Sequence, residues 1–284
     1  MKYDLASDLH IDIGTVSPID WVNVRNEGSD LLVVAGDISN SAASTIAELR
    51  RAATIYNHVI FVDGNHEHYG NRRKYKSVQQ NEAEMILELA NDHNITFLNV
   101  RSPMKVMGNV AFVGCNSWYN FEFYPEHETK ANAVAAYLNG SNDWSNCNFS
   151  VQPEMMAVDH ANVMADAVTK LQDYNLVEKI VVITHTAPDS QSLTWKAHDN
   201  NWNLLNAAYG NSEMKKVWDA DTGEKIVHAV HGHIHDRRDY MLENGIRILA
   251  NPRGYVHYEP SAAHWMPVQF ETDDERGIYK SAFA

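Results

Sequence analysis

Short apolar runs recur along this chain, and nearly every run ends at a Gly, Asp or Asn. The runs are too short for helices and too continuously apolar for strands with one wet face, a pattern typical of strands buried on both sides. We therefore expect buried strands at 2–7, 30–36, 58–64, 95–100, 109–114, 179–185, 225–232 and 245–251.

Segments between these runs carry apolar residues at helical spacing. Ile46, Leu49 and Tyr56 fall on one face of segment 44–56, and segment 77–92 repeats the pattern. Strands that alternate with helices favour an α/β fold with parallel pairing and right-handed crossovers.

The alternation lapses between about 118 and 175, where aromatic and polar stretches precede a helix expected to begin near Pro153. Proline is well tolerated in the first turn of a helix. The strand pattern resumes at Lys179, so we interpret 118–175 as an insertion or lid within a single domain that spans 1–284. The aromatic side chains of such a lid could stack on a nucleobase, so nucleotide-derived substrates are among the candidates.

Charge and composition exclude several classes of protein. The formal net charge is −14, which disfavours a nucleic-acid partner because proteins that bind nucleic acids are usually basic. No apolar stretch reaches the roughly 18–20 residues that cross a bilayer, so no membrane association is expected. Two cysteines without CxxC spacing and a start without a signal-peptide pattern predict a cytoplasmic location.

Polar side chains gather at the points where the expected strands end. Ligands of open α/β sheets bind beyond the carboxyl ends of the strands, so such residues can form one shared site. Five strand ends deliver Asp, Asn or His: Asp8 and His10 in "SDLH", Asp37 in "GD", Asn65 and His66 in "GNH", His185 in "VVITH", and His233 and His235 in "HGHIH".

Carboxylate, amide and imidazole donors without thiolate suit divalent Mn, Fe, Zn, Ni or Mg. The donors are too many for one four-coordinate zinc and sufficient for two ions that share a carboxylate. Two ions roughly 3.5–4 Å apart stabilise both oxygens of an in-line displacement at phosphorus. The residues therefore predict two divalent metal ions and an anionic substrate, with Mn²⁺ expected to support activity in vitro.

The motifs "DLH", "GD", "GNHE", "ITH" and "GHIH", in this order, resemble the motif set of the calcineurin-like metallophosphoesterases. They span residues 8 to 235. The resemblance implies an α/β fold of two packed mixed β-sheets flanked by helices, together with a dinuclear metal site. It implies that a metal-bridging hydroxide attacks phosphorus and that His66, which is no ligand, acts as general acid near the leaving oxygen.

The same resemblance assigns the ligands. Asp37 would bridge the two ions. One ion would be held by Asp8, His10 and His235, and the other by Asn65, His185 and His233.

One departure from the family's motifs disfavours one branch of the family. The second motif runs "GDISNSA" and lacks the arginine of GDxxDRG, which disfavours a phosphoprotein phosphatase. The stretch through "NPRGY" looks like a small, bacterial and phage-type branch, within which Arg253 is the candidate substrate-binding residue because its planar fork suits phosphate oxygens.

The sequence predicts a metal-dependent phosphohydrolase of a small phosphorylated substrate, either a phosphomonoester or a small phosphodiester. The alternatives are a nuclease, which the basic stretch "NRRKYK" (71–76) would serve, and a non-catalytic scaffold of the same fold. Around the site, Glu67 could orient His66 or cap the next helix, and His231 is expected to be structural. Asp143 could face the site. The natural substrate, the physiological metals and the oligomeric state stay open.

Overall fold

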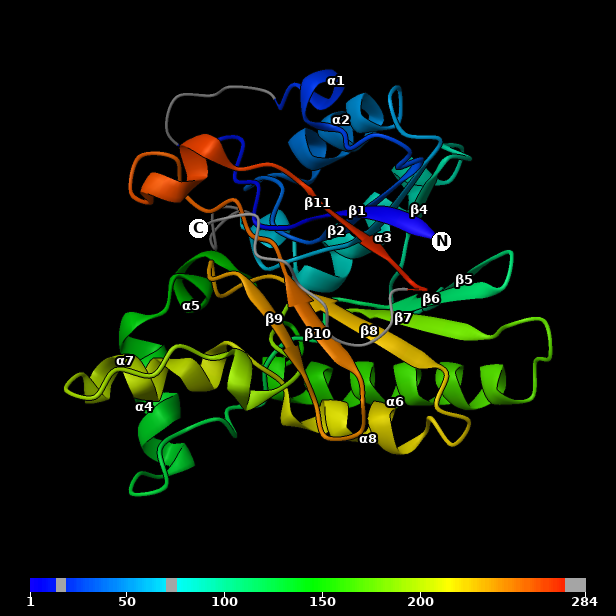
Figure 1. The fold of residues 1–284 in the computed structure, drawn as a ribbon. Coiled ribbons are helices and arrows are strands. Elements are labelled where there is room, and N and C mark those ends of the chain that lie inside the picture. Colours follow the sequence, from blue (N-terminus) through cyan, green and yellow to red (C-terminus); the bar gives the residue numbers. More distant parts are fainter. Residues whose placement is uncertain (14–18, 70–75, 274–284) are drawn as a thin grey trace.

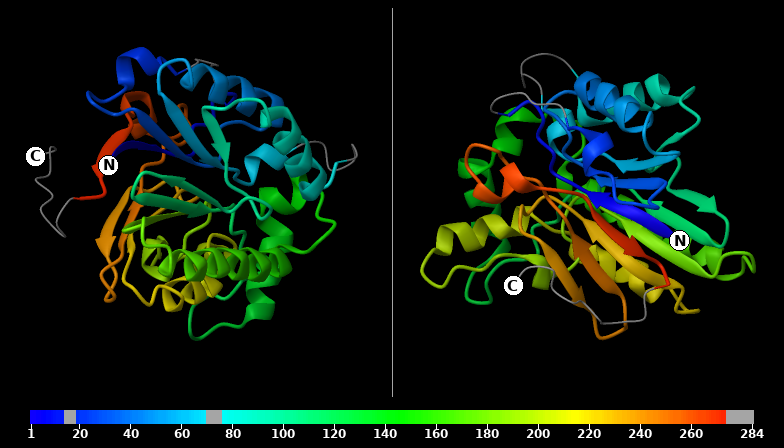
Figure 2. Two further views of the ribbon diagram at one scale, coloured as in Figure 1. Left: turned by 90° about the vertical axis from the view of Figure 1, so that its right-hand side faces the viewer. Right: turned by 45° about the horizontal axis from the view of Figure 1, so that its top comes forward.

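Two β-sheets pack face to face in the computed structural model, which describes residues 1–13, 19–69 and 76–273 (Figure 1). Helices cover the outer face of each sheet (Figures 1 and 2). The expectation of an α/β fold with two packed mixed sheets is confirmed.

The first sheet has the strand order β11-β1-β2-β3-β4. Its strands pair in parallel, except that β11 runs antiparallel to β1. The bounds are β1 Lys2–Ala6, β2 Leu31–Ala35, β3 His58–Val62, β4 Ile95–Phe97 and β11 Val268–Glu271.

The second sheet has the order β5-β6-β7-β8-β10-β9. Its four inner strands are parallel, and β5 and β9 are antiparallel edges. The bounds are β5 Met104–Met107, β6 Val110–Gly114, β7 Lys179–Ile183, β8 Ile226–His231, β9 Arg238–Met241 and β10 Arg247–Ala250.

Strand residues alternate between two apolar layers, as period-2 geometry requires. In β2, Val33 points into the core between the sheets, and Leu32 and Val34 point toward the helices. In β7, Val181 likewise faces the other sheet, and Val182 faces the helical layer. Burial on both faces explains why these strands read as continuous apolar runs.

The first sheet is covered by α1 (Trp21–Val24), α2 (Ala42–Ala52) and α3 (Val78–Leu89). Ser77 and Gln80 form a capping box at the start of α3, so the sequence itself fixes this boundary. The helix expected at 44–56 ends earlier, at Ala52.

The segment interpreted as an insertion has two parts. Its long helix α6 (Pro153–Gln172) begins at Pro153 as expected and packs with α8 (Lys215–Asp219) against the second sheet (Figure 2). The other helices, α4 (Lys130–Gly140) and α5 (Asn142–Asn146), lie beside α7 (Asn200–Leu205) at one end of the sheets (Figure 1). A cluster around Trp118 and Tyr137 forms their own core.

Candidate metal centre

The motif residues converge beyond the carboxyl ends of β1, β2, β3, β7 and β8. Three groups of side chains place possible ligand atoms within 4.8 Å of one another: Asp8, His10 and His235; His10, Asp37 and His66; and Asp37, His185 and His233. Asn65 adds an amide oxygen 2.8 Å from His185 Nε2. The structure therefore brings together every residue predicted as a ligand, although the two sheets contribute them from distant parts of the chain.

Asp37 lies between the two predicted ligand sets. Its Oδ2 is 3.3 Å from His185 Nε2 and 3.9 Å from His10 Nε2, which belong to opposite sets. Its Oδ1 accepts a hydrogen bond from the backbone N–H of His66 at 2.9 Å. One carboxylate oxygen is thus fixed by the backbone, and the other faces imidazoles on both sides.

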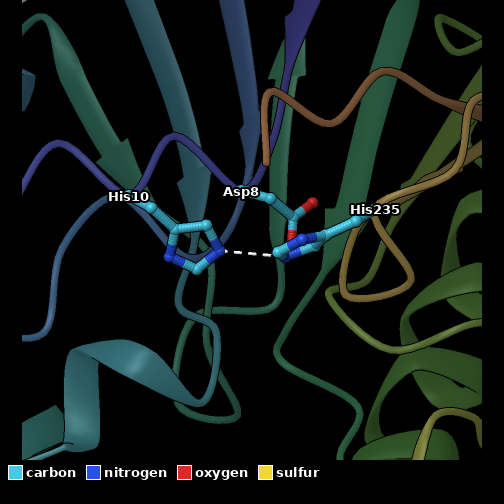
Figure 3. A group of neighbouring side chains, drawn as sticks. All are labelled: Asp8, His10 and His235. Carbon is cyan, nitrogen blue, oxygen red and sulfur yellow. Dashed lines mark hydrogen bonds and ion pairs between the residues drawn. The ribbon is translucent and has the colours of Figure 1, made fainter. Parts of the chain in front are cut away.

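The side chains of the first ligand set, Asp8, His10 and His235, lie close together (Figure 3). His10 Nε2 and His235 Nε2 lie 3.0 Å apart, and Asp8 Oδ1 lies 3.6 Å from His235 Nε2. Asp8 Oδ2 is buried and has no hydrogen-bond partner among the described residues. A buried carboxylate oxygen without a donor is costly, and a cation at this point would satisfy it. The donor set therefore fits a divalent metal ion.

Hydrogen bonds on the far side of the imidazoles fix which nitrogen faces the centre. His185 Nδ1 donates to the Ala35 carbonyl oxygen at 2.8 Å, and His235 Nδ1 donates to Glu259 Oε1 at 2.8 Å. Nε2 is therefore the ring nitrogen that faces the centre in both histidines. Such outer partners set the tautomer and orientation of metal-binding histidines.

The amide of Asn65 is oriented by the insertion. Its Nδ2 donates to Asp143 Oδ1 at 2.7 Å, so its oxygen points to His185. Asp143 also accepts from the hydroxyls of Tyr69 and Tyr119. Burial raises the pKa of Asp143, and the hydrogen bonds from Tyr69 and Asn65 oppose that rise.

Three motif glycines leave room for ligands from other motifs. A Cβ at Gly64 would lie 2.1 Å from Asp37 Oδ1, and one at Gly36 would lie 2.5 Å from His185 Nδ1. A Cβ at Gly232 would lie 2.6 Å from Asp8 Oδ2. Each glycine is therefore required by a side chain from a different strand end.

The ligand-bearing turns are also strained. Positive φ angles of 41° to 71° occur at Asp8, His10, Asp37, His233 and His235. The left-handed region costs an L-residue about 1–2 kcal/mol, and Asp and His are among the side chains that enter it more often. Such strain at adjacent turns is typical of functional sites.

Glu67 joins the turns after β2 and β3. Its buried carboxylate accepts from the backbone N–H groups of Asp37 at 3.0 Å, Ile38 at 2.7 Å and Gly64 at 2.7 Å. It also accepts from the hydroxyl of Thr45 at 3.1 Å. Burial and the nearby Asp37 carboxylate raise the pKa of Glu67 to about 7. Of the two roles considered for Glu67, orienting His66 or capping a helix, neither describes these contacts.

The electrostatic surroundings shift the pKa values of the site's histidines in opposite directions. Burial alone would lower the pKa of His185, but Asp37 and Asp8 outweigh it and raise that pKa to about 10. Burial lowers the pKa of His233 to about 3 and that of His10 well below its usual range. For Asp37, burial is outweighed by His185 and His66, which hold its pKa well below the usual value.

The centre opens into a cleft of about 290 Å³. Apart from the metal-site residues, its walls carry aromatic rings on several sides: Tyr69, Trp202, Tyr209 and Tyr255. His66 lines the cleft as well, as its expected catalytic role requires.

Arg253 is not among the residues that line this cleft. Its Nη1 donates to the carbonyl oxygen of Leu9 at 3.0 Å, and burial lowers the pKa of its guanidinium. Tyr255, two residues further along the same "NPRGY" stretch, reaches the cleft instead. Asn40, Glu259 and Tyr255 are site residues that the sequence analysis missed, although Asn40 lay in the stretch "GDISNSA" and Tyr255 in the stretch "NPRGY".

His231 and His68 are placed away from the ligand atoms. His231 lies 2.8 Å from Ser192 Oγ and 3.0 Å from the carbonyl oxygen of Gly232, in agreement with the expected structural role. His68 Nε2 pairs with Asp63 Oδ2 at 2.6 Å in a buried ion pair.

Comparison with known proteins decides the family. The sequence profile of the family described as calcineurin-like phosphoesterase matches residues 1–237. The chain belongs to the calcineurin-like phosphoesterase family. The motif-based expectation is therefore confirmed, and the phosphoesterase region contains every predicted metal ligand.

Individual relatives of this phosphoesterase are distant. An uncharacterised protein of Acanthamoeba polyphaga mimivirus is 23% identical over 89% of this chain and 90% of its own length. The crystal structure of a phosphopantetheinyl hydrolase from Mycobacterium tuberculosis has a TM-score of 0.69 and 19% identity, and covers 94% of this chain and 95% of that one. A dimetal phosphatase from Danio rerio has a TM-score of 0.48 and 15% identity, with 94% and 90% coverage.

Within the described residues, the phosphoesterase has no helix that is both long and apolar enough to cross a membrane.

Proposed function

We propose that this phosphoesterase hydrolyses phosphomonoesters or small phosphodiesters, including nucleotide-derived ones, with two divalent metal ions. The observation that carries the proposal is the position of Asp37, whose Oδ2 faces imidazoles of both ligand sets. A shared carboxylate between two sets is what a pair of ions needs. Oxygen and nitrogen donors without thiolate suit Mn, Fe, Zn, Ni or Mg, and Mn²⁺ is our choice for assays.

The residues would divide as the motifs suggest. Asp8, His10 and His235 would hold one ion, Asn65, His185 and His233 the other, and Asp37 both. When bound, two such ions neutralise phosphate oxygens and lower the pKa of bound water.

The protein itself positions the leaving group. His66 lines the cleft, and its Nδ1 is 2.5 Å from Asn40 Oδ1. An amide oxygen only accepts, so Nδ1 carries the proton and Nε2 faces the cleft. When Nε2 is protonated as well, His66 can donate that proton from this position to the leaving oxygen of a bound ester. A well-placed general acid contributes typically about 10²–10⁴-fold to the rate.

We propose only the chemical class of the substrate, a small phosphate ester. The M. tuberculosis neighbour is named a phosphopantetheinyl hydrolase, so we include a phosphopantetheinyl phosphodiester in the panel of test substrates. The two cysteines are both free and buried, which supports our proposal that the enzyme works in the reducing cytoplasm.

A nuclease is the second candidate, since the same centre can cleave nucleic acid. The net charge of −14 counts against it. The basic stretch at 71–76 that would favour it lies outside the described residues, except for Lys76. Binding to oligonucleotides that falls steeply with salt would support the nuclease over the small-molecule enzyme.

The test combines elemental analysis with hydrolysis of p-nitrophenyl phosphate and bis-p-nitrophenyl phosphate in Mn²⁺. We expect two ions per chain and metal-dependent turnover. Asp37→Asn should abolish turnover and weaken metal binding, whereas His66→Ala should keep both ions and lower kcat. A metal-free, inactive wild-type protein would favour the scaffold, and loss of metal in His66→Ala would contradict the role given to His66.

A further inference from the structure

Tyr255 places its hydroxyl beside the nitrogen of His66 that faces the cleft. The distance from Tyr255 Oη to His66 Nε2 is 3.4 Å. The Tyr255 ring packs on two metal-site imidazoles, with ring centroids 4.5 Å from His10 and 4.6 Å from His235. It therefore lies over one ligand set and points toward the proposed general acid.

Several contacts hold this pair in place. His66 stacks on Tyr69 with ring centroids 4.1 Å apart, and its Nδ1 is engaged by Asn40. Tyr255 lies in the turn that follows β10, where the backbone N–H of Gly254 donates to the carbonyl oxygen of Asp8 at 2.9 Å. The two polar atoms thus approach the cleft from different sheets and end next to each other.

We propose that Tyr255 is a second catalytic residue, whose hydroxyl donates a hydrogen bond to the same leaving oxygen that His66 protonates. This inference rests on the proposed function. An oxygen seated between two donors 3.4 Å apart can accept from both of them.

The chemical step balances without any change at the tyrosine. A hydroxide oxygen bonds to phosphorus as the ester P–O bond breaks, and the electron pair of the broken bond stays on the leaving oxygen. The proton on Nε2 of a doubly protonated His66 completes the alcohol and leaves the ring neutral with its proton on Nδ1. Tyr255 keeps its proton, since a phenol is protonated at neutral pH, and offers only a hydrogen bond to the negative charge that develops.

A purely structural Tyr255 would need its ring but not its hydroxyl. Tyr255→Phe keeps the packing on His10 and His235 and removes the donor alone. The matched control is Tyr258→Phe, because Tyr258 is three residues away and 79% exposed.

The decisive measurement is the dependence of rate on the leaving group. We compare p-nitrophenyl, phenyl and methyl phosphates on Mn²⁺-loaded wild type, Tyr255→Phe and Tyr258→Phe. For p-nitrophenol, a stable leaving group, Tyr255→Phe should lose less than about threefold in kcat/KM, whereas for the poorer leaving groups it should lose about 10²-fold, as when a preorganised donor is removed. Equal losses for all three esters, or no loss, would overturn the proposal.

A binding measurement tests the same point without turnover. In a benzylphosphonate a CH₂ group replaces the leaving oxygen, so Tyr255→Phe and wild type should bind it with equal dissociation constants by calorimetry. Weaker binding by the variant would overturn the assignment to the leaving oxygen. Wild-type protein that hydrolyses none of the esters would instead refute the proposed function, which separates the two failures.

Discussion

Asn65 donates from its side-chain amide to Asp143 Oδ1 at 2.7 Å, which joins the turn after β3 to helix α5 across 78 residues of sequence. An amide has one donor end and one acceptor end, so this bond decides which end meets the metal site. Asp143 is 4% exposed and belongs to the segment that interrupts the strand pattern. The segment therefore contributes one carboxylate that orients a residue of the candidate metal centre.

Asp143→Asn should weaken metal binding at one ligand set only. The new amide presents N–H groups where Asn65, Tyr69 and Tyr119 donate, so Asn65 loses its fixed orientation. Loss of such an outer partner costs typically about 10–100-fold in metal affinity. Calorimetric titration with Mn²⁺ should show one weakened and one unchanged site. The exposed Asp173→Asn is the control, and two unchanged sites in Asp143→Asn would contradict the orienting role.

The inner strands and the polar side chains that gather at the strand ends could be predicted from the sequence because local pattern encodes them. Strands buried on both faces are continuous apolar runs, and turns after parallel strands meet at one edge. The edge strands β5, β9 and β11 were not predicted, since they are short and partly exposed: β5 and β9 contain no fully buried residue, and β11 contains one. Their place depends on partners far away in the chain.

The residues that hydrogen-bond to the candidate ligands from outside could not be predicted from the sequence, because their positions also depend on distant parts of the chain. Glu259 contacts His235 only because the turn after β10 folds back over the site, and no motif marks it. Arg253 and Tyr255 stand two residues apart in one stretch, and residue type alone favoured the arginine. The backbone of the turn sends the arginine to Leu9 and the tyrosine to the cleft.

Gly64→Ala should empty the centre of metal while the fold persists. The added methyl would lie 2.1 Å from Asp37 Oδ1, so the shared carboxylate must move. We expect loss of most metal by elemental analysis and a fall in activity comparable to that of Asp37→Asn. Gly140→Ala is the matched control, since its Cβ meets only Leu205 at 3.6 Å. A metal-loaded Gly64→Ala protein would show that the turn can relax.

Glu67→Gln should lower both stability and activity at pH 8. The Glu67 carboxylate accepts hydrogen bonds from backbone N–H groups in the turns after β2 and β3. A glutamine side chain would place its NH₂ group, which is a donor, against some of these N–H donors. Breaking such a buried charged network costs about 3 kcal/mol of unfolding free energy. Urea titration measures the loss, with the exposed Glu88→Gln in α3 as control. An unchanged midpoint would refute the bracing role of Glu67.

His228 should make the fold sensitive to acid independently of the metal centre. It is buried on β8, where its Nδ1 lies 2.8 Å from the hydroxyl of Tyr3, and burial together with Arg247 and Lys179 lowers its pKa to about 3. The unfolded chain binds a proton at this histidine near pH 6.5 and the folded chain does not until about pH 3. Stability should therefore fall as pH drops below about 6.5, by about 1.4 kcal/mol per pH unit from this group, and level off near pH 3.

Replacing the ring removes that dependence. His228→Asn keeps an oxygen that can accept from Tyr3 but binds no proton in this range, so the slope of unfolding free energy against pH should become shallower by about 1.4 kcal/mol per unit between pH 6.5 and 4.5. Urea titrations at several pH values in the presence of a chelator give the slope. His58→Asn, at the exposed start of β3, is the matched control. If the unfolding free energies of wild type and His228→Asn have the same slope against pH, then His228 binds a proton as readily in the folded protein as in the unfolded chain, which would contradict the prediction.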